Sequence, residues 1–176
     1  MNHRIATADD IPAIRDLMAR AIAANQRSFL DEAQIRASNA VMGLDTQLIA
    51  DGTYFVICDG DVIVGSGGWS ARATLYGGDH STSLRDPKLL DPASDAARVR
   101  AMYTDPDYVR RGLGRLILDL CESAARAAGF KRAEMMATLS GEPLYGACGY
   151  TEIERTAAPP VDGVVVPLVR MGKSIA

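Results

Sequence analysis

The chain has 176 residues, the usual size of one domain, and is long enough to bury a core without disulfide or metal staples. Its 48% hydrophobic and 23% charged residues match ordinary globular proteins, which excludes disorder, collagen and coiled coil as classes. The formal net charge of −3 argues against a surface that attracts nucleic acid or anionic membranes as a whole. We therefore expect a single domain over residues 1–176, with any attraction for anions confined to a local site.

The cysteines and the N-terminus indicate where such a protein works. Cys58, Cys121 and Cys148 are far apart and show no Cys-x-x-Cys spacing, which is typical of reduced cysteines in a cytoplasmic protein. The N-terminus lacks the apolar stretch of a signal peptide, and no apolar run approaches the ~18 residues of a membrane helix. No histidine, cysteine or aspartate cluster has metal-ligand spacing. We expect a cytoplasmic protein with no metal and with neither nucleic acid nor membrane as partner.

The N-terminal quarter of the chain predicts one strand and two helices. Residues 3–6 suit a short strand. Thr7 and Asp10 then form a capping pattern before apolar residues that recur at the helical period, so we expect a helix over residues 8–24. A second helix is expected over about residues 28–41, before a glycine.

A change of period in the next segment predicts a hairpin. Residues 53–58 are rich in aromatic and β-branched side chains, and the pair Asp59-Gly60 separates them from a second apolar run. Such a pair favours a type I′ turn, whose central residues need positive φ. The second strand extends from residue 61 toward Ala73, weakened by three glycines. Residues 76–96 form a long loop of the kind that often carries function.

The C-terminal half predicts alternating strands and helices. Its clearest helix has one apolar stripe and ends at Gly129, a suitable C-cap. The expected strands cover residues 97–104, 131–138, 150–155 and 164–172, with a turn at 105–108 and helices over 112–129 and 141–148.

One glycine- and arginine-rich segment, Val109-Arg110-Arg111-Gly112-Leu113-Gly114-Arg115, leads into that clear helix. Its glycines allow a ligand to approach the backbone, and the first N–H groups of a helix are unpaired donors favoured by the helix dipole. Residues 98–132 also carry eight basic against four acidic residues. The pattern predicts a phosphate site; the alternative is a glycine turn into a core helix with solvated arginines.

Other glycine-rich phosphate motifs fit less well. The Walker A pattern Gly-x-x-x-x-Gly-Lys-Ser/Thr is absent. A dinucleotide fingerprint needs Gly or Ala where Ile117 stands. A nucleotide-binding regulator stays open only as a third interpretation.

The order of elements, with the short-helix sequence Leu144-Tyr145-Gly146-Ala147-Cys148-Gly149-Tyr150, resembles the GNAT superfamily of acyl-CoA-dependent N-acetyltransferases. The family loop pattern is Gln/Arg-x-x-Gly-x-Gly/Ala, and this chain departs from it only at Val109. The resemblance spans nearly the whole chain and is most specific over residues 97–155. It implies an α+β GNAT fold, in which a mixed, mostly antiparallel sheet is flanked by helices on both faces.

The resemblance also implies acetyl-CoA as cosubstrate. Its pantetheine would bond to the backbone of Met102, Tyr103 and Thr104. Its pyrophosphate would lie on the N–H groups of Arg110, Arg111, Gly112, Leu113, Gly114 and Arg115. The family's catalytic tyrosine corresponds to Tyr145, which would protonate the departing thiolate; a phenol with a pKa of ~10 suits a thiol with a pKa of ~8.5. The alternative is that Tyr145 is a half-buried aromatic of an amphipathic helix.

The general base is left open by the sequence. Many relatives carry a glutamate where Arg98 stands, so the base is open among Glu134, Glu142, Asp79, His80 and a chain of water molecules. His80 is one of two histidines and lies in the long loop, and histidine is a common agent of proton transfer.

The acceptor site is suggested only in outline. Residues 67–72 and 75–80 are candidates to line it, although Trp69 suits a core equally and Arg72 suits a solvated surface. We expect acetyl transfer to a primary amine of a small molecule or peptide, with a homodimer implied by resemblance alone. The alternative is a catalytically inactive acyl-CoA-binding regulatory module, favoured by the missing carboxylate at Arg98.

Overall fold

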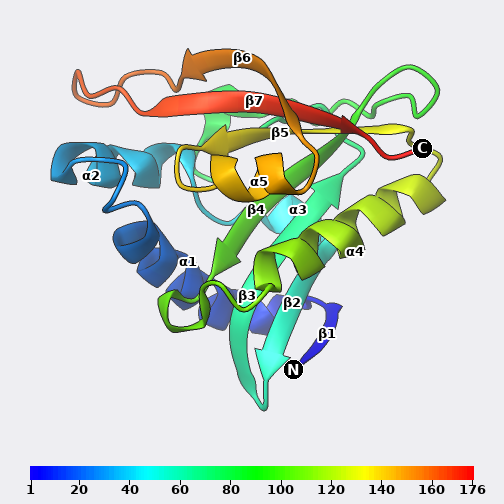
Figure 1. Ribbon diagram of the computed structural model, residues 1–176, viewed down its shortest axis with the longest axis horizontal. Coiled ribbons are helices and arrows are strands. Elements are labelled where there is room, and N and C mark those ends of the chain that lie inside the picture. Colours follow the sequence, from blue (N-terminus) through cyan, green and yellow to red (C-terminus); the bar gives the residue numbers. More distant parts are fainter.

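The computed structural model describes residues 1–176 and contains one seven-stranded sheet in the order β1-β2-β3-β4-β5-β7-β6 (Figure 1). All neighbouring strands are antiparallel except β4 and β5. This confirms the expected mixed, mostly antiparallel sheet. The strands are β1 (Asn2–Ile5), β2 (Tyr54–Asp59), β3 (Val62–Ser70), β4 (Ala97–Thr104), β5 (Arg132–Thr138), β6 (Thr151–Ala157) and β7 (Pro167–Ser174).

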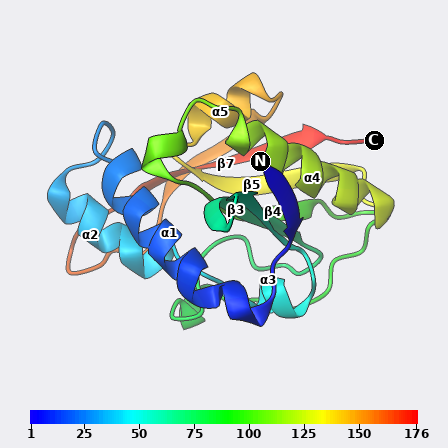
Figure 2. The same cartoon turned by 90° about the horizontal axis from the view of Figure 1, so that it is seen from below.

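Helices cover both faces of the sheet, as expected (Figure 2). On one face lie α1 (Ile11–Asn25), α2 (Glu32–Val41) and α3 (Thr46–Ala50), and on the other α4 (Leu113–Ala127) and α5 (Glu142–Ala147). No helix is long and apolar enough to cross a membrane. The helix α4 packs so closely on β3 that a Cβ at Gly67 would lie 2.5 Å from Cγ2 of Ile117. This close approach explains a glycine in the middle of a strand.

The strand β4 has two irregularities. First, β4 pairs with β5 only at Ala97–Ala133 and Arg98–Glu134, after which the two strands part. Second, the register between β3 and β4 shifts so that two residues of β4 oppose one of β3, which is a β-bulge. Within the bulge, Ala101 has a φ of +52°, which is uncommon for a residue with a side chain. The sheet therefore opens beside a kinked strand.

Most elements begin and end within three residues of their predicted bounds, and β4 matches them fully. The second helix is shorter than expected because Asp31 caps it. The Asp31 side chain accepts from the amide of Gln34 (2.8 Å), and the Gln34 side chain accepts from the amide of Asp31 (3.1 Å). This reciprocal capping box fixes the helix start at Glu32. The five-residue α3 was not predicted, since it is too short to show a period.

The predicted hairpin is present, but its turn lies one residue further along. Asp59 pairs with Val62, so Gly60 and Asp61 are the central residues of the turn. Only Gly60 has a positive φ (+60°), which is the pattern of a type II′ turn and not of type I′. The following strand ends at Ser70, before Ala73, because the Ser70 hydroxyl accepts a hydrogen bond from the amide of Arg72 (3.0 Å) and turns the chain.

Candidate functional site

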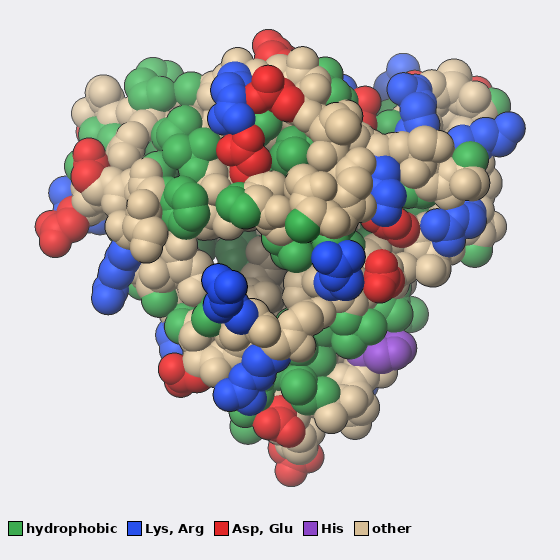
Figure 3. Space-filling view, viewed as in Figure 1, with side chains coloured by type: hydrophobic (Ala, Val, Ile, Leu, Met, Phe, Trp, Pro, Cys, Tyr) green, Lys and Arg blue, Asp and Glu red, His purple; other side chains and the backbone are tan.

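A cleft opens where β4 and β5 part. It is open to solvent and is lined by 16 residues, of which 12 are hydrophobic. The lining comes from the end of α2, from residues 75–77 and from β4, β5, α5 and β7. Figure 3 shows a hollow on this face between α5 and the start of α4, with basic side chains along its lower rim. The cleft thus passes through the sheet, from the α2 face to the α5 face.

Tyr145 lies on α5 and contributes to the cleft. Its hydroxyl makes no hydrogen bond within the protein, and its ring packs edge-on against Tyr150 at 6.3 Å between centroids. Burial raises the pKa of the Tyr145 phenol above its ordinary value, so the hydroxyl keeps its proton well above neutral pH. The absence of a Cβ at Gly114 lets α5 approach α4, since that atom would collide with Leu144. The structure thus presents an unpaired proton donor to the cleft.

The loop before α4 folds sharply and leaves amide groups free. Arg110 has a φ of +62° and Gly112 a φ of +82°. The first hydrogen bond of the helix runs from the amide of Leu116 to the carbonyl of Gly112 (3.0 Å). The amides of Leu113, Gly114 and Arg115 therefore precede the helical ladder and have no acceptor in the protein. Such an N-terminus suits an anion.

The arginine side chains of this loop differ in their surroundings. The Arg111 guanidinium stacks on the Tyr108 ring, 4.6 Å from its centroid. The Tyr108 hydroxyl donates to Asp59 at 2.8 Å, which ties the loop to the β2–β3 hairpin. Arg110 and Arg115 are exposed and have no ion-pair partner. Positive charge is therefore free beside the unpaired amides.

Two arginines of β4 do not contribute to that charge. Arg98 pairs with Glu134 at 3.0 Å, and Glu134 also binds Arg170 at 2.6 Å. Arg100, with a side chain only 2% exposed, pairs with Asp45 at 3.1 Å and donates to the carbonyl of Gly77 at 2.7 Å. The basic surplus over residues 98–132 therefore overstates the free positive charge, because Arg98 and Arg100 are neutralised locally.

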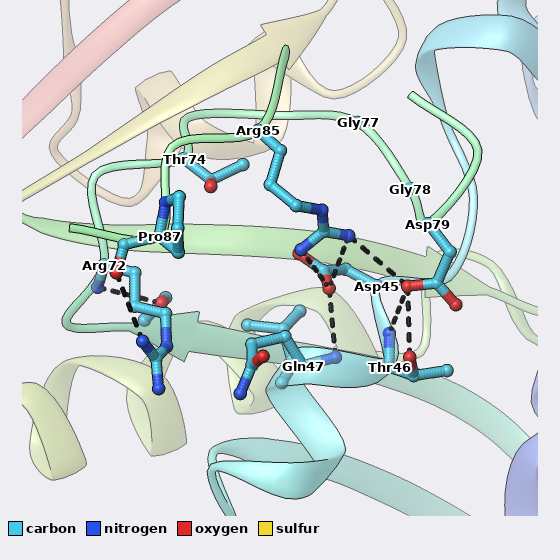
Figure 4. A network of polar contacts seen from close by, with 12 residues as sticks. Asp45, Thr46, Gln47, Arg72, Thr74, Gly77, Gly78, Asp79, Arg85 and Pro87 are labelled. Atoms are coloured by element: carbon cyan, nitrogen blue, oxygen red, sulfur yellow. Dashed lines mark hydrogen bonds and ion pairs between the residues drawn. The ribbon is translucent and has the colours of Figure 1, made fainter. Parts of the chain in front are cut away.

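A network of polar contacts holds the loop that follows β3 (Figure 4). The Asp45 carboxylate, which is also the N-cap of α3, accepts from Arg85 at 3.1 Å as well as from Arg100. Asp79 accepts from the amide of Thr46 at 2.9 Å and from Arg85 at 3.4 Å. The loop is thereby pinned to α3 and to β4.

The same loop closes the end of α2. Nε2 of His80 donates to the carbonyl of Asn39 at 2.6 Å, and the Ser81 hydroxyl donates to the carbonyl of Ala40 at 2.7 Å. These carbonyls belong to the last turn of α2, which has no helical donors for them. Residues 75–77, which line the cleft, are thus carried on a loop fixed at three places.

The structure brings none of the four candidate bases to the cleft lining. Glu134 is held by two arginines, Glu142 pairs with Arg155, Asp79 binds Thr46 and Arg85, and His80 binds α2. The lining contains no carboxylate and no histidine. No group of three His, Cys, Asp or Glu side chains is placed to hold a metal ion.

Of the residues expected to line the acceptor site, some lie outside the cleft and others line it. Trp69 is 8% exposed and packs edge-on against Phe130 at 5.9 Å, so it belongs to the core. Arg72 pairs with Asp51 at 2.8 Å, outside the cleft. Of the second stretch, only residues 75–77 reach the lining.

The strand residues expected to hold pantetheine lie at the cleft in part. Met102 and Tyr103 line it, and the Tyr103 hydroxyl accepts from the amide of Gly43 at 3.0 Å. Thr104 does not line it, and its carbonyl already accepts from the Asn25 side chain at 3.0 Å.

Two features of the site were missed in the sequence. Arg100 stands between Val99 and Ala101 in an apolar strand, a pattern that indicates a buried carboxylate partner. The second feature has no sequence pattern. The fully buried Tyr54 hydroxyl lies 2.8 Å from the carbonyl of Ala101 and 2.9 Å from the Ser66 hydroxyl. Tyrosine has one hydroxyl proton, so Tyr54 donates to Ala101 and accepts from Ser66. This chain holds the bulge in place.

Replacing Tyr54 with phenylalanine is expected to lower the free energy of unfolding by about 1–3 kcal/mol, because the carbonyl of Ala101 loses its partner. Urea denaturation measures the change. Adding Ala101→Gly should recover about 1 kcal/mol, since glycine adopts the positive φ of the bulge without steric cost. Equal stability of Tyr54→Phe and the wild type would contradict the assigned role of the hydroxyl.

Comparison with known proteins bears on the fold and on the family of this chain. No protein of curated function matches the sequence significantly. The fold is similar to a GCN5-related N-acetyltransferase from Rhodopseudomonas palustris (TM-score 0.71, 18% identity, covering 98% of this chain and 94% of that one). It is also similar to the PaiA N-acetyltransferase of Thermoplasma acidophilum in complex with coenzyme A (TM-score 0.65, 11% identity, 98% of both chains). A third similar structure is YncA of Salmonella typhimurium with acetyl-CoA (TM-score 0.64, 18% identity, 100% and 94%).

At such identities these likenesses concern the fold alone. The sequence itself carries the family relationship, because the model of the acetyltransferase (GNAT) family matches residues 15–150. That stretch runs from α1 through β4, the arginine-rich loop and α5 to the start of β6. The chain therefore belongs to the GNAT family of acetyltransferases.

Proposed function

We propose that this protein transfers an acetyl group from acetyl-CoA to a primary amine by direct attack. One observation carries the proposal: Tyr145 lines the cleft at the opening between β4 and β5, and the free amides at the start of α4 lie next to α5, since a Cβ at Gly114 would collide with Leu144. Structural neighbours that hold coenzyme A or acetyl-CoA support the choice of cosubstrate.

The cosubstrate would be held mainly by backbone groups. The amides of residues 110–115 would bind the pyrophosphate, aided by the free arginines Arg110 and Arg115. The pantetheine would lie along Met102 and Tyr103, where β4 has no partner strand on its β5 side. Thr104 offers only its amide, because its carbonyl is already bonded to Asn25.

The bulge of β4 supplies a donor for the reacting thioester. A trans peptide directs its N–H opposite to its C=O. Since the carbonyl of Ala101 points to the Tyr54 hydroxyl, the amide of Met102 points away from it. We assign this amide to the thioester oxygen, where it would stabilise the negative charge that develops during attack.

The remaining steps move protons. The lone pair of a neutral amine attacks the thioester carbon, the carbon–sulfur bond breaks, and Tyr145 gives its proton to the departing thiolate. No side chain of the lining can take the proton that the amine loses, so we assign this proton to water, which also returns a proton to the Tyr145 phenolate.

The cofactor site is tested at Gly112. An aspartate there is expected to weaken acetyl-CoA binding at least tenfold, because its carboxylate would repel the phosphates. The matched Gly112→Asn protein tolerates the same positive φ, has no charge, and should stay within threefold of the wild type. Calorimetry measures the affinity for acetyl-CoA and for acetyl-pantetheine, which lacks the phosphates. Repulsion by the carboxylate should weaken only the binding of acetyl-CoA, whereas a distorted loop would affect both variants alike. Equal affinities of the Asp and Asn variants for acetyl-CoA would refute the phosphate site.

An acyl-CoA-binding module without catalysis is the second candidate. The observation that favours it is the ion pair of Arg98 with Glu134, which leaves the cleft without a carboxylate. Single-turnover mixing of enzyme, acetyl-CoA and a panel of amines decides the matter. A transferase releases coenzyme A with the acetylated amine, whereas a binding module retains acetyl-CoA unchanged.

A further inference from the structure

We propose that the acceptor is a small apolar monoamine, that is, an amine with no second charge. This inference rests on the proposed function and names the substrate class of that same cleft. Its basis is the half of the cleft lined by the end of α2, the loop after β3, β5 and β7. Because Tyr145 comes from α5, on the other face of the sheet, we assign this half to the acceptor.

The walls of this half are apolar side chains. They come from separate elements: Met42 follows α2, Leu75 and Tyr76 lie on the loop after β3, Met136 lies on β5 and Leu168 on β7. Met42, Tyr76 and Met136 pack against one apolar cluster that includes Leu168. An alkyl or aryl substituent loses contact with water against such walls, which is favourable by roughly 25 cal/mol for each Å² of apolar surface buried.

The only charged residue in the lining is Arg100, and it is already neutralised. Its side chain is 2% exposed, and Asp45 and the carbonyl of Gly77 take its hydrogen bonds. An acceptor carboxylate would find no free cation here, and a second ammonium group would find no free anion. Either group would be desolvated without a partner, which is costly.

The walls are also held in place before any ligand binds. Residues 75–77 belong to the loop whose Arg85 binds Asp45, which Arg100 binds as well (Figure 4). His80 and Ser81 of the same loop bind carbonyls at the end of α2. A carboxylate cannot swing into the cleft from this loop without breaking that network, since Asp79 is bonded to Thr46 and Arg85. The apolar character of the wall is therefore part of the fold.

Three amines of equal chain length test the proposal: hexylamine, 1,6-diaminohexane and 6-aminohexanoate. Each has six carbons, and they differ only at the sixth, which is a methyl, an aminomethyl or a carboxylate group. We expect kcat/KM for hexylamine to exceed that of each of the others at least tenfold, measured as coenzyme A release at a fixed pH. A charged partner accepted as well as hexylamine would overturn the proposal, as would acetylation of peptide N-termini but of no alkylamine.

A charge placed on the wall gives the converse test. Met136→Glu should raise kcat/KM for 1,6-diaminohexane relative to hexylamine at least tenfold, because the new carboxylate pairs with the second ammonium. Met136→Gln is the matched control and should leave the ratio unchanged. If the Glu variant does not fold, Leu75→Asp and Leu75→Asn place the same pair of changes on the part of the lining that comes from the loop after β3. An unchanged ratio in the charged variant would count against this location for the acceptor.

A binding measurement without catalysis tests the acceptor class separately from the transferase function. Calorimetry on the protein saturated with desulfo-coenzyme A, which cannot transfer an acetyl group, should rank hexylamine above 1,6-diaminohexane and 6-aminohexanoate. This ranking without any coenzyme A release would refute the transferase function and leave the apolar-amine site standing. Release of coenzyme A with another ranking would uphold the transferase function and refute the acceptor class.

Discussion

The Tyr145→Phe protein is expected to turn over about 100-fold more slowly than the wild type, with an affinity for acetyl-CoA within twofold of normal. The substitution removes only the proton that the thiolate needs when it leaves. The Tyr145 hydroxyl is the suitable donor because burial raises the pKa of the phenol, so it remains protonated throughout the range where amines become neutral. Steady-state kinetics with calorimetry of acetyl-CoA binding measures both quantities.

Tyr150 supplies the control for this experiment. Its ring touches that of Tyr145, but it is 3% exposed and does not line the cleft. Tyr150→Phe should therefore leave kcat near the wild-type value. If Tyr145→Phe retained full turnover, or if both variants lost it equally, the hydroxyl of Tyr145 would not be the acid.

Removing the Asp45 carboxylate is expected to cost about 3–5 kcal/mol of unfolding free energy, the second large effect. Asp45 is the only carboxylate bonded to Arg100, and its side chain is 3% exposed. Without it the guanidinium of Arg100 stays buried and unpaired, and Arg85 loses its shorter contact with a carboxylate as well. Urea denaturation of Asp45→Ala measures the loss.

Two further variants test whether the lost charge of Asp45 causes the loss of stability. Asp45→Asn keeps an acceptor for the amide of Gln47 at the start of α3, so its loss of stability reports the charge without the helix cap. The double variant Asp45→Leu, Arg100→Met removes both buried charges and should be more stable than Asp45→Ala. A double variant no more stable than Asp45→Ala would mean that the ion pair is not what Asp45 contributes.

The sequence predicts those elements whose pattern is long and local. The bounds of β4 were correct because an apolar strand lies between a loop and a turn. The helix α4 lies within two residues of its predicted bounds, 112–129, because its apolar stripe runs over four turns. The short α3 was not predicted and the start of α2 was predicted too early, since both depend on single capping residues, Asp45 and Asp31. Local periodicity cannot show where one hydrogen bond decides a boundary.

The residues of the candidate site also fall into those that a local motif predicts and those that only the fold brings together. The arginine-rich loop and Tyr145 could be proposed from the sequence because each is a compact motif; the structure places Tyr145 in the cleft lining and the loop at the start of α4, next to α5. The candidate bases could not be ranked, because their availability depends on partners far along the chain: Glu134 is bonded to Arg98 and Arg170, 36 residues away on either side. The bulge at Ala101 depends on Tyr54, 47 residues away. Such pairings exist only in the folded chain.

The parting of β4 from β5 has a consequence for the folded protein as a whole. From Val99 onward, the side of β4 that faces β5 is an unpaired strand edge inside the sheet. A ligand whose amides complete that edge acts as an eighth strand, so it stabilises the native state as well as reacting there. Ligand at 100 times its dissociation constant adds about 2.7 kcal/mol to the stability of a protein that binds it only when folded. The resistance of this sheet to unfolding would thus rise and fall with the supply of its own cosubstrate.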